Sequence, residues 1–202
     1  MLTIALPKGR IADETLDRFK KAFGEKFVFE DRKLILEKSG FKFLNVRNQD
    51  VPTYVMHGAA DWGVVGLDVL EEKEYDLIKL LDLKLGRCKV AFGLRAGEKL
   101  NFDKSKITIA TKHEKIAKKY FEQKAMAVEI IKLYGSIELA PLVGLCDCIV
   151  DIVETGETMK QNGLEVGPTI METTAHLIAN KNSFYAKKDL IFDLKDKLEK
   201  FL

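Results

Sequence analysis

The stretch CDCIVDIVETGETMKQNG, residues 146–163, decides how the chain folds. It begins with β-branched residues, which are typical of a buried strand, and passes through Thr155-Gly156-Glu157-Thr158 into a helical pattern. In open α/β sheets, ligands bind beyond the carboxyl ends of the strands, where unpaired backbone N–H groups are available. Because Gly156 lets the backbone approach an anion closely, we expect this turn to bind a phosphate, with Asp151 placed to hold a sugar diol. The alternative is a capped helix start with a permissive glycine.

Strand-like and helix-like segments alternate on both sides of this stretch. The run ITIAT (107–111) precedes a helical pattern, and LTIAL (2–6) does the same near the N-terminus. The strand-like DWGVVG (61–66) follows Asp50-Val51-Pro52, an N-cap acid with proline in the first turn. This alternation predicts largely parallel sheets covered on both faces. Because the charged loop GEKLNFDKSK (97–106) separates two such blocks, we predict two α/β lobes.

Two further segments have clear patterns. RKLILEK (32–38) and FKFLNVR (41–47) predict an antiparallel pair of strands around Ser39-Gly40. The C-terminal segment predicts an amphipathic helix that packs on a lobe and carries no chemistry. The apolar face of this helix consists of Leu190, Ile191, Leu194, Leu198 and Phe201.

The composition argues against several classes of protein. The hydrophobic fraction of 47% and the charged fraction of 32% are typical of a globular protein, and a net charge of +2 argues against a nucleic-acid binder. No apolar run approaches the roughly 18 residues of a membrane span, and the N-terminus lacks the charge order of a signal peptide, so we expect a cytoplasmic protein with no membrane contact. The spacing of Cys88, Cys146 and Cys148 predicts buried thiols.

Three other predicted strand-to-helix junctions carry glycine, cations or carboxylates. LPKGR (6–10) places two cations beside a glycine, which suits a polyphosphate because arginine can bind phosphate oxygens in pairs. RNQD (47–50) and GLD (66–68) are similar junctions, and parallel strands gather such residues at one edge of each lobe. Taken singly, each junction can also be a solvated turn or an N-cap. The residues are Lys8, Gly9, Arg10, Arg47, Asp50, Gly66 and Asp68.

The sequence contains no pairing of a nucleophile with a base. His57, His113 and His176 lie in unrelated segments, so we expect structural roles for them. A P-loop is excluded because the pattern G-x-x-x-x-G-K-[ST] does not occur.

Five blocks together resemble the ATP phosphoribosyltransferase family. They are ALPKGR (5–10), DRKL (31–34), VRNQDVPTYVMHGAADWGVVGLDVL (46–70), GSIELAP (135–141) and DIVETGETM (151–159). Their order and spacing match over nearly the whole chain.

The resemblance implies the first enzyme of histidine biosynthesis. Such an enzyme joins N1 of the ATP adenine to C1 of 5-phosphoribosyl 1-diphosphate, releases diphosphate and needs Mg²⁺. The implied fold is α/β and of the two-lobed periplasmic-binding-protein type (type II), with mostly parallel sheets and a two-stranded hinge. Lobe I would contain residues 1–90 and 171–202, and lobe II residues 91–170 with the phosphoribosyl-binding loop.

The resemblance also implies the site residues, and no metal ligand is assigned among them. The donor would be bound by Asp151, Glu154, Thr155, Gly156, Glu157 and Thr158. Charge on ATP and the leaving group would be stabilised by Lys8, Arg32 and Arg47. The ATP and pyrophosphate side would consist of Lys8, Gly9, Arg10, Arg32, Arg47, Gly66, Asp68 and Glu138. Two departures concern ATP contacts: Lys89 stands where arginine is usual, and a block with the family pattern KYPNxxRRYF begins with Lys112-His113.

The length resembles the short form of the family. Members of this form work with a subunit similar to histidyl-tRNA synthetase, so we expect a hetero-octamer, self-association and histidine regulation. Two alternatives are kept. A solute-binding module would share the fold without a reaction. A phosphoribosyltransferase of the common Rossmann-like type would pair adjacent acids before its loop, whereas Asp151 and Glu154 are separated here.

Overall fold

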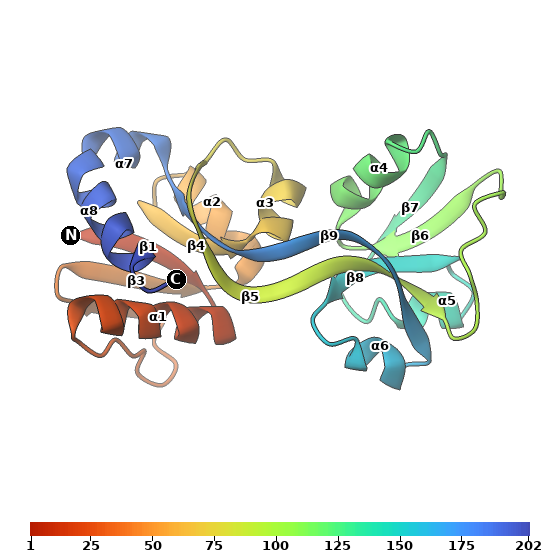
Figure 1. Cartoon of the computed structure of the whole chain (residues 1–202), viewed down its shortest axis with the longest axis horizontal. Helices are drawn as coiled ribbons and strands as arrows, with labels where there is room; N and C mark the ends of the chain where they lie inside the picture. The colour runs from red at the N-terminus through yellow and green to blue at the C-terminus, as the bar shows by residue number, and fades with distance from the viewer. The chain divides into compact units, whose positions relative to one another are not determined.

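The structure, a computed structural model, describes residues 1–202 and divides into two units. Unit 1 contains Met1–Gly86 and Thr174–Leu202, and unit 2 contains Arg87–Thr173. The chain passes between them along two long strands, β5 (Ile78–Arg95) and β9 (Leu164–Ala179) (Figure 1). The boundaries expected from the sequence, after residues 90 and 170, lie a few residues from those of the units.

Unit 1 contains a mixed sheet with parallel strands at its centre. β1 is parallel to β3 and to β4, while β2 and β9 run antiparallel to their neighbours in the order β2-β3-β1-β4-β9. The strands are β1 (Leu2–Pro7), β2 (Ile35–Lys38), β3 (Phe41–Val46) and β4 (Trp62–Gly66). The helices are α1 (Arg10–Phe23), η1 (Asn48–Asp50), α2 (Val51–Met56), α3 (Leu67–Lys73), α7 (Lys181–Ala186) and α8 (Lys188–Glu199).

Both faces of this sheet are covered by apolar helix faces. One face buries Leu16 and Phe19 of α1 with Leu194 of α8 against Phe43, while the other buries Val55 of α2 and Val69 of α3. The helical spacing of these residues turns one stripe of each helix inward, as the sequence pattern predicts. Of the face predicted for the C-terminal helix, however, Leu190 and Phe201 are exposed, and only Ile191, Leu194 and Leu198 are buried.

Unit 2 has the strand order β5-β8-β6-β7, with β6 parallel to β7 and to β8. Its strands are β6 (Ile107–Thr111), β7 (Val128–Lys132) and β8 (Cys148–Val153). Its helices are α4 (Glu114–Glu122), α5 (Leu139–Leu142) and α6 (Glu157–Gln161). Ile116 and Phe121 of α4 pack on one face of the sheet, and Ala140 of α5 and Met159 of α6 pack on the other.

The predicted hairpin is confirmed, and two other elements differ from prediction. Ser39 and Gly40 both have positive φ, of 51° and 82°, which suits the tight turn between β2 and β3. The sequence from Tyr75 to Ala96 contains two strand-like runs, YDLIKLLDLKL (75–85) and CKVAFGLRA (88–96), but the structure has one continuous strand there, β5. The run SIELAPLVGL (136–145) has a helical pattern of apolar residues, but it forms only the four-residue α5.

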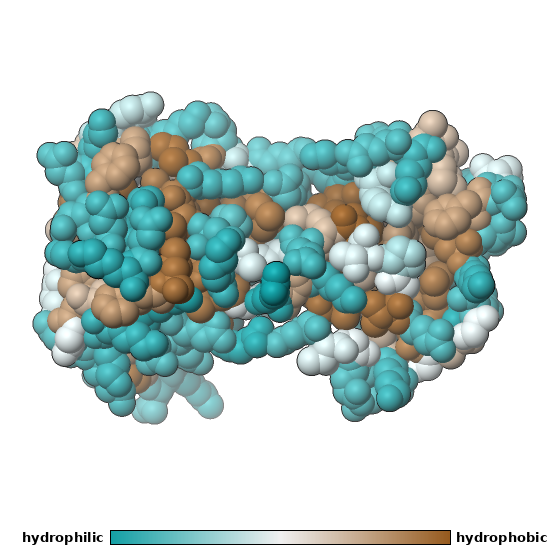
Figure 2. Space-filling model, in the orientation of Figure 1, coloured by the Kyte–Doolittle hydropathy of each residue, from teal (hydrophilic) through white to brown (hydrophobic).

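The surface is charged, with apolar residues exposed in both units. On the face drawn in Figure 2, hydrophobic residues reach the surface among hydrophilic side chains. None of the helices has the length and apolar character that crossing a membrane requires.

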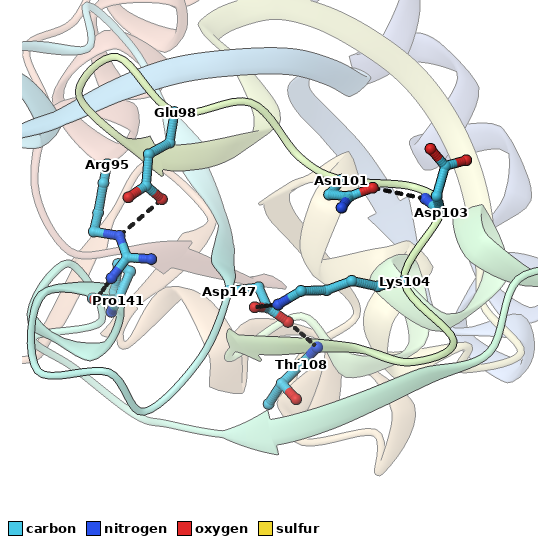
Figure 3. Close-up of polar contacts among 8 residues, drawn as sticks. All are labelled: Arg95, Glu98, Asn101, Asp103, Lys104, Thr108, Pro141 and Asp147. Carbon is cyan, nitrogen blue, oxygen red and sulfur yellow. Dashed lines mark hydrogen bonds and ion pairs between the residues drawn. The ribbon is translucent and has the colours of Figure 1, made fainter.

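Each unit fixes its central parallel strands with the same arrangement around an aspartate. In unit 1 the carboxylate of Asp61 accepts the N–H of Thr3 at 2.9 Å and the ammonium of Lys187 at 2.8 Å. In unit 2 the carboxylate of Asp147 accepts the N–H of Thr108 at 2.9 Å and the ammonium of Lys104 at 2.5 Å (Figure 3). Hydrogen bonding to Lys104 and Thr108 lowers the pKa of Asp147. The two units therefore share a structural device that no repeat in the sequence reveals.

We expect Asp61→Ala to lower the free energy of unfolding by about 2–3 kcal/mol. The Asp61 side chain is only 12% exposed, so its loss leaves the Thr3 N–H and the Lys187 ammonium without their acceptor. Urea unfolding followed by circular dichroism measures the change. Asp193→Ala, which removes an exposed pair with Lys197 on α8, is the control and should change stability little. Equal stability of the two variants would contradict the prediction.

A second carboxylate, Asp82, fastens β5 to β9 within unit 1. It accepts the N–H of Lys84 at 2.9 Å and its ammonium at 2.5 Å, and the Thr174 hydroxyl at 2.8 Å. Burial alone would raise the pKa of Asp82, but these bonds and the nearby His176 lower it to about 2. Lys84 has φ of 56° inside the strand, and the bond from its own N–H to Asp82 holds this unusual backbone.

We expect the protein to lose stability as the pH falls. Burial lowers the pKa of His176 below 6.5, so its neutral form contributes stability that declines as the pH falls below 6.5. The folded-state pKa of Asp82 is also below its ordinary value of 3.8, so its contribution is complete above 3.8 and is lost toward about 2. Melting temperatures between pH 7 and about pH 2 measure this. Asp82→Asn should flatten the decline below pH 4, and an unchanged decline would contradict the role of Asp82.

Candidate active site

The carboxyl ends of three parallel strands meet at one edge of unit 2. β6 ends at Thr111, β7 at Lys132 and β8 at Val153. The N–H of Leu133 donates to the carbonyl of Thr111 at 3.1 Å, and Lys132 forms an ion pair with Glu114 at the start of α4. The segments that follow these strands therefore lie together, as the sequence predicts for a parallel sheet.

The loop after β8 adopts a form that requires glycine. Gly156 has φ of 82° and ψ of 0°, in the left-handed region. A Cβ at this position would lie 2.9 Å from Cγ2 of Val166. Thr155 and Thr158 are exposed on either side of it, while Met159 is buried and anchors α6 to the core. Met159 thus fixes the loop to the core, and the loop exposes its backbone and its threonine hydroxyls at the surface.

Three backbone N–H groups of this loop have no acceptor within the chain. They belong to Thr155, Gly156 and Thr158, whereas the N–H of Glu157 donates to Oγ1 of Thr155 at 3.3 Å. The first bond within α6 runs from the N–H of Lys160 to the carbonyl of Gly156 at 3.0 Å. N–H groups that converge beside a positive-φ glycine can bind phosphate oxygens.

Asp151 lies just before this loop, with its carboxylate engaged by neighbouring groups. Its Oδ1 accepts the N–H of Ile152 at 2.8 Å and lies 2.9 Å from Nζ of Lys112 and 3.8 Å from Nε2 of His113. The carboxylate is 13% exposed, so it stays accessible to a small polar ligand. Glu154 and Glu157 are exposed in the loop itself.

Glu138 lies on the same face of unit 2. It immediately precedes α5 and is half-buried. Its neighbour Ile137 is buried in one cluster with Val153 and Met159, which support the loop. The structure therefore places Glu138 in the segment next to the loop, and we keep its role in binding as a prediction.

In unit 1, Lys8 and Arg47 directly follow two adjacent strands, β1 and β3. Pro7 of β1 is in register with Val46 of β3, and the N–H of Lys8 donates to the carbonyl of Val46 at 2.8 Å. Both side chains are exposed, and neither forms an ion pair within the chain. Gly9 caps α1 with φ of 95°, a conformation that favours glycine.

Arg32 lies at the same edge of the unit 1 sheet as Lys8 and Arg47, although it precedes a strand instead of following one. Since β2 runs antiparallel to β3, with Ile35 opposite Leu44, the segment before β2 lies at the carboxyl end of β3. Arg32 is exposed and has no ion pair within the chain, whereas Arg10 lies 3.7 Å from Glu14 on α1. Three unpaired cations, Lys8, Arg32 and Arg47, therefore gather at one edge of unit 1.

Gly66 and Asp68 occupy the junction of β4 and α3. Gly66 is buried and precedes α3, and Asp68 is only 2% exposed in the first turn of that helix. This placement favours a supporting role for Asp68 over direct contact with a ligand.

Two pockets lie within single units. The pocket of unit 1, about 230 Å³, extends from Gly9 along α1 to Lys20 and includes Asn45 of β3. The pocket of unit 2, about 180 Å³, lies at the start of β6, the edge opposite the β8–α6 loop. Four of the charged residues in its lining are already paired, Arg95 with Glu98 and Lys104 with Asp147 (Figure 3), and only Lys99 has no ion pair. It is therefore not a candidate for the active site.

Sequence reasoning considered Lys112 and His113 only in a block associated with ATP contacts, and it did not predict that they lie beside Asp151. They form the junction between β6 and α4, the neighbour of the β8–α6 junction in the sheet. Their position directly after the strand ITIAT was the available signal.

Comparisons of the sequence with known proteins agree with one another. A family model described as HisG: ATP phosphoribosyltransferase matches residues 47–200. An ATP phosphoribosyltransferase from Wolinella succinogenes is 66% identical over 200 residues, covering 99% of this chain and 97% of the relative. Another from Campylobacter curvus is 63% identical over 199 residues, covering 98% of this chain and 97% of the relative.

Solved structures agree on the fold. The ATP phosphoribosyl transferase (HisG:HisZ) complex from Thermotoga maritima matches with a TM-score of 0.85 and 36% identity, covering 99% of this chain and 98% of that chain. The periplasmic aliphatic sulphonate binding protein SsuA from Escherichia coli matches with a TM-score of 0.63 and 11% identity, covering 98% of this chain and 71% of that chain. The second likeness shows the fold alone, and it confirms the predicted periplasmic-binding-protein type.

Proposed function

Because the chain belongs to the ATP phosphoribosyltransferase family, we propose that its β8–α6 loop binds the 5-phosphate of the ribosyl donor. The family's reaction joins N1 of the ATP adenine to C1 of 5-phosphoribosyl 1-diphosphate and releases diphosphate. It is the first step of histidine biosynthesis. The observation that carries the placement of the donor is the loop 154–158, with three unpaired N–H groups and two exposed threonine hydroxyls beside Gly156.

The Asp151 carboxylate would bind the ribose hydroxyls. It lies at the end of β8, directly before the loop, and its remaining exposure allows hydroxyl groups to donate to it. Charge-assisted hydrogen bonds of this kind are stronger than bonds between neutral groups. They would fix the ribose relative to its 5-phosphate, which the loop holds.

Lys8, Arg32 and Arg47 would bind the phosphates of ATP or the departing diphosphate. This assignment is supported by their position, because all three are exposed at one edge of unit 1 without a carboxylate partner. As the bond to diphosphate breaks, negative charge grows on the leaving group, and positioned cations stabilise it. The adenine N1 attacks with its own lone pair, so the reaction needs no general base, consistent with the lack of a nucleophile–base pair in the sequence. The main catalytic contributions would be alignment of the two substrates and electrostatic stabilisation.

Mg²⁺ would act together with the substrates. The structure has no group of three or more His, Cys, Asp or Glu side chains arranged to hold a metal ion. Mg²⁺ commonly binds through one or two carboxylates, water and substrate phosphates, and the exposed Glu154 and Glu157 fit that donor set. When bound, the ion would neutralise diphosphate charge.

We also propose a partner subunit similar to histidyl-tRNA synthetase, in a hetero-octamer located in the cytoplasm. The Thermotoga maritima relative was solved as a HisG:HisZ complex. Further support comes from apolar side chains at the surface of unit 2, since such residues often mark protein interfaces (Figure 2). The exposed large apolar residues of this unit are Phe102, Tyr134, Leu139, Leu142, Val143 and Leu145.

The direct test is formation of the ribosylated adenine, followed by its ultraviolet absorbance. The chain is mixed with ATP, 5-phosphoribosyl 1-diphosphate, Mg²⁺ and pyrophosphatase, with and without the synthetase-like subunit. Product that appears or rises sharply with the subunit would support both the reaction and the partner. Folded protein that binds neither substrate and forms no product would favour a solute-binding module instead.

A further inference from the structure

The ion pair between Lys112 and Asp151 links two strand-to-helix junctions of unit 2. The parallel register of β6 and β8 pairs Thr111 with Val150, which places Lys112 beside Asp151. The hydroxyl of Thr111 donates to the carbonyl of Val150 at 2.6 Å, and the N–H of His113 donates to Oγ1 of Thr111 at 2.8 Å. The backbone on both sides of Lys112 is therefore fixed against β8, while its side chain is 32% exposed.

The strand end and loop are otherwise acidic. Asp151, Glu154 and Glu157 place three carboxylates between the end of β8 and the start of α6. The donor of the proposed function carries a 5-phosphate and a diphosphate, so it meets electrostatic repulsion there. A cation beside Asp151 offsets this repulsion, and the Lys112 ammonium, 2.9 Å from the carboxylate, occupies that place.

We infer that Lys112 is a donor-binding residue that exchanges partners when the donor binds. In the free protein its ammonium neutralises Asp151. When the ribose hydroxyls donate hydrogen bonds to the Asp151 carboxylate, the Lys112 ammonium leaves it and binds a phosphate oxygen of the donor. This inference rests on the proposed placement of the donor at 151–158.

The side chains suit such an exchange. Oδ1 of Asp151 also accepts the N–H of Ile152 at 2.8 Å, a bond that does not involve the lysine, so this bond can orient the carboxylate after the ammonium leaves. Lysine is a compact charge on a flexible stem, and it can turn without moving the backbone. Since Lys112 is partly exposed, the ammonium can reach an acceptor in solvent without crossing packed core.

A purely structural role makes a different prediction, which a double-mutant cycle can separate. If Lys112 only neutralised Asp151, its removal would have no effect once Asp151 had become asparagine. If it also binds the donor, its removal must weaken donor binding in both backgrounds.

The experiment compares Lys112→Met, Asp151→Asn and the double variant with the unaltered protein, in the presence of Mg²⁺ and the partner subunit. The readouts are the KM values for donor and ATP, and the Kd of the donor by calorimetry. We expect Lys112→Met to raise the donor KM and Kd about 10-fold in both backgrounds, with the ATP KM within about 2-fold. Lys112→Arg should restore donor binding to within about 3-fold because it keeps the charge.

Lys106→Met is the matched control. Lys106 forms an ion pair with Glu129, and it directly precedes β6, at the edge opposite the loop. The Lys106→Met substitution should leave the donor KM unchanged.

Three results would overturn the inference. The first is an unchanged donor KM in Lys112→Met. The second is an effect of Lys112→Met that disappears in the Asp151→Asn background, which would make lysine a neutraliser of Asp151 only. The third is an unchanged donor KM in Asp151→Asn, which would refute the placement of the donor itself. In the first two cases the proposed function stands, because Asp151→Asn still loses donor binding.

Discussion

Replacing Asp151 with asparagine should lower kcat/KM for the ribosyl donor by about 10²- to 10³-fold. Asparagine keeps the size of the side chain and an acceptor for the Ile152 N–H, but it loses the negative charge that receives the ribose hydroxyls. Each charge-assisted hydrogen bond contributes about 1.5–3 kcal/mol, and a diol makes two of them. The loss should be in binding of the donor, because the ATP contacts are assigned to other residues. Steady-state kinetics with each substrate varied in turn measures it.

The control for Asp151 is a carboxylate of the same unit outside the site. Glu129 of β7 forms an exposed ion pair with Lys106, so Glu129→Gln removes a charge without touching the loop. Its kcat/KM should stay within about 2-fold of the unaltered protein. If Asp151→Asn behaves like Glu129→Gln, Asp151 does not bind the donor.

The fold and the position of the loop could be predicted because their causes are local. β-branched runs followed by glycine turns predict strands with helices after them, and parallel pairing then places their carboxyl ends at one edge. Gly156 illustrates this, since its φ of 82° and the 2.9 Å approach to Val166 both require glycine. The shortness of α5 could not be predicted from the helical pattern of 136–145, because packing rather than propensity sets the length of a short helix.

The contact between Lys112 and Asp151, which lie far apart in the chain, could not be predicted from the sequence. Lys112 meets Asp151 only because the register of β6 and β8 pairs Thr111 with Val150. The place of Arg32 at the edge that carries Lys8, in contrast, follows from the antiparallel pairing of β2 with β3, which the sequence predicts. The equivalence of Asp61 and Asp147 leaves no repeat in the sequence, since one aspartate with a backbone donor and a lysine is enough to build it.

Arg47→Ala should lower kcat/KM by about 10²-fold. Arg47 follows β3 directly, is exposed, and has no carboxylate within the chain to occupy its guanidinium, so a phosphate is its proposed partner. The kcat/KM of Arg47→Lys should lie between those of the unaltered protein and Arg47→Ala, because lysine keeps the charge but cannot offer two parallel N–H donors to one phosphate.

The matched control is Lys42→Ala, on the same strand. Lys42 pairs with Glu37 in the middle of the β2–β3 ladder, away from the carboxyl end of β3. Its removal should leave kcat/KM near that of the unaltered protein. A loss in Arg47→Ala that appears in kcat and kcat/KM alike would place the arginine on the leaving group, because it would report contact in the transition state alone. A rise in the KM of ATP with kcat unchanged would place it on ATP, and wild-type kinetics would remove Arg47 from the site.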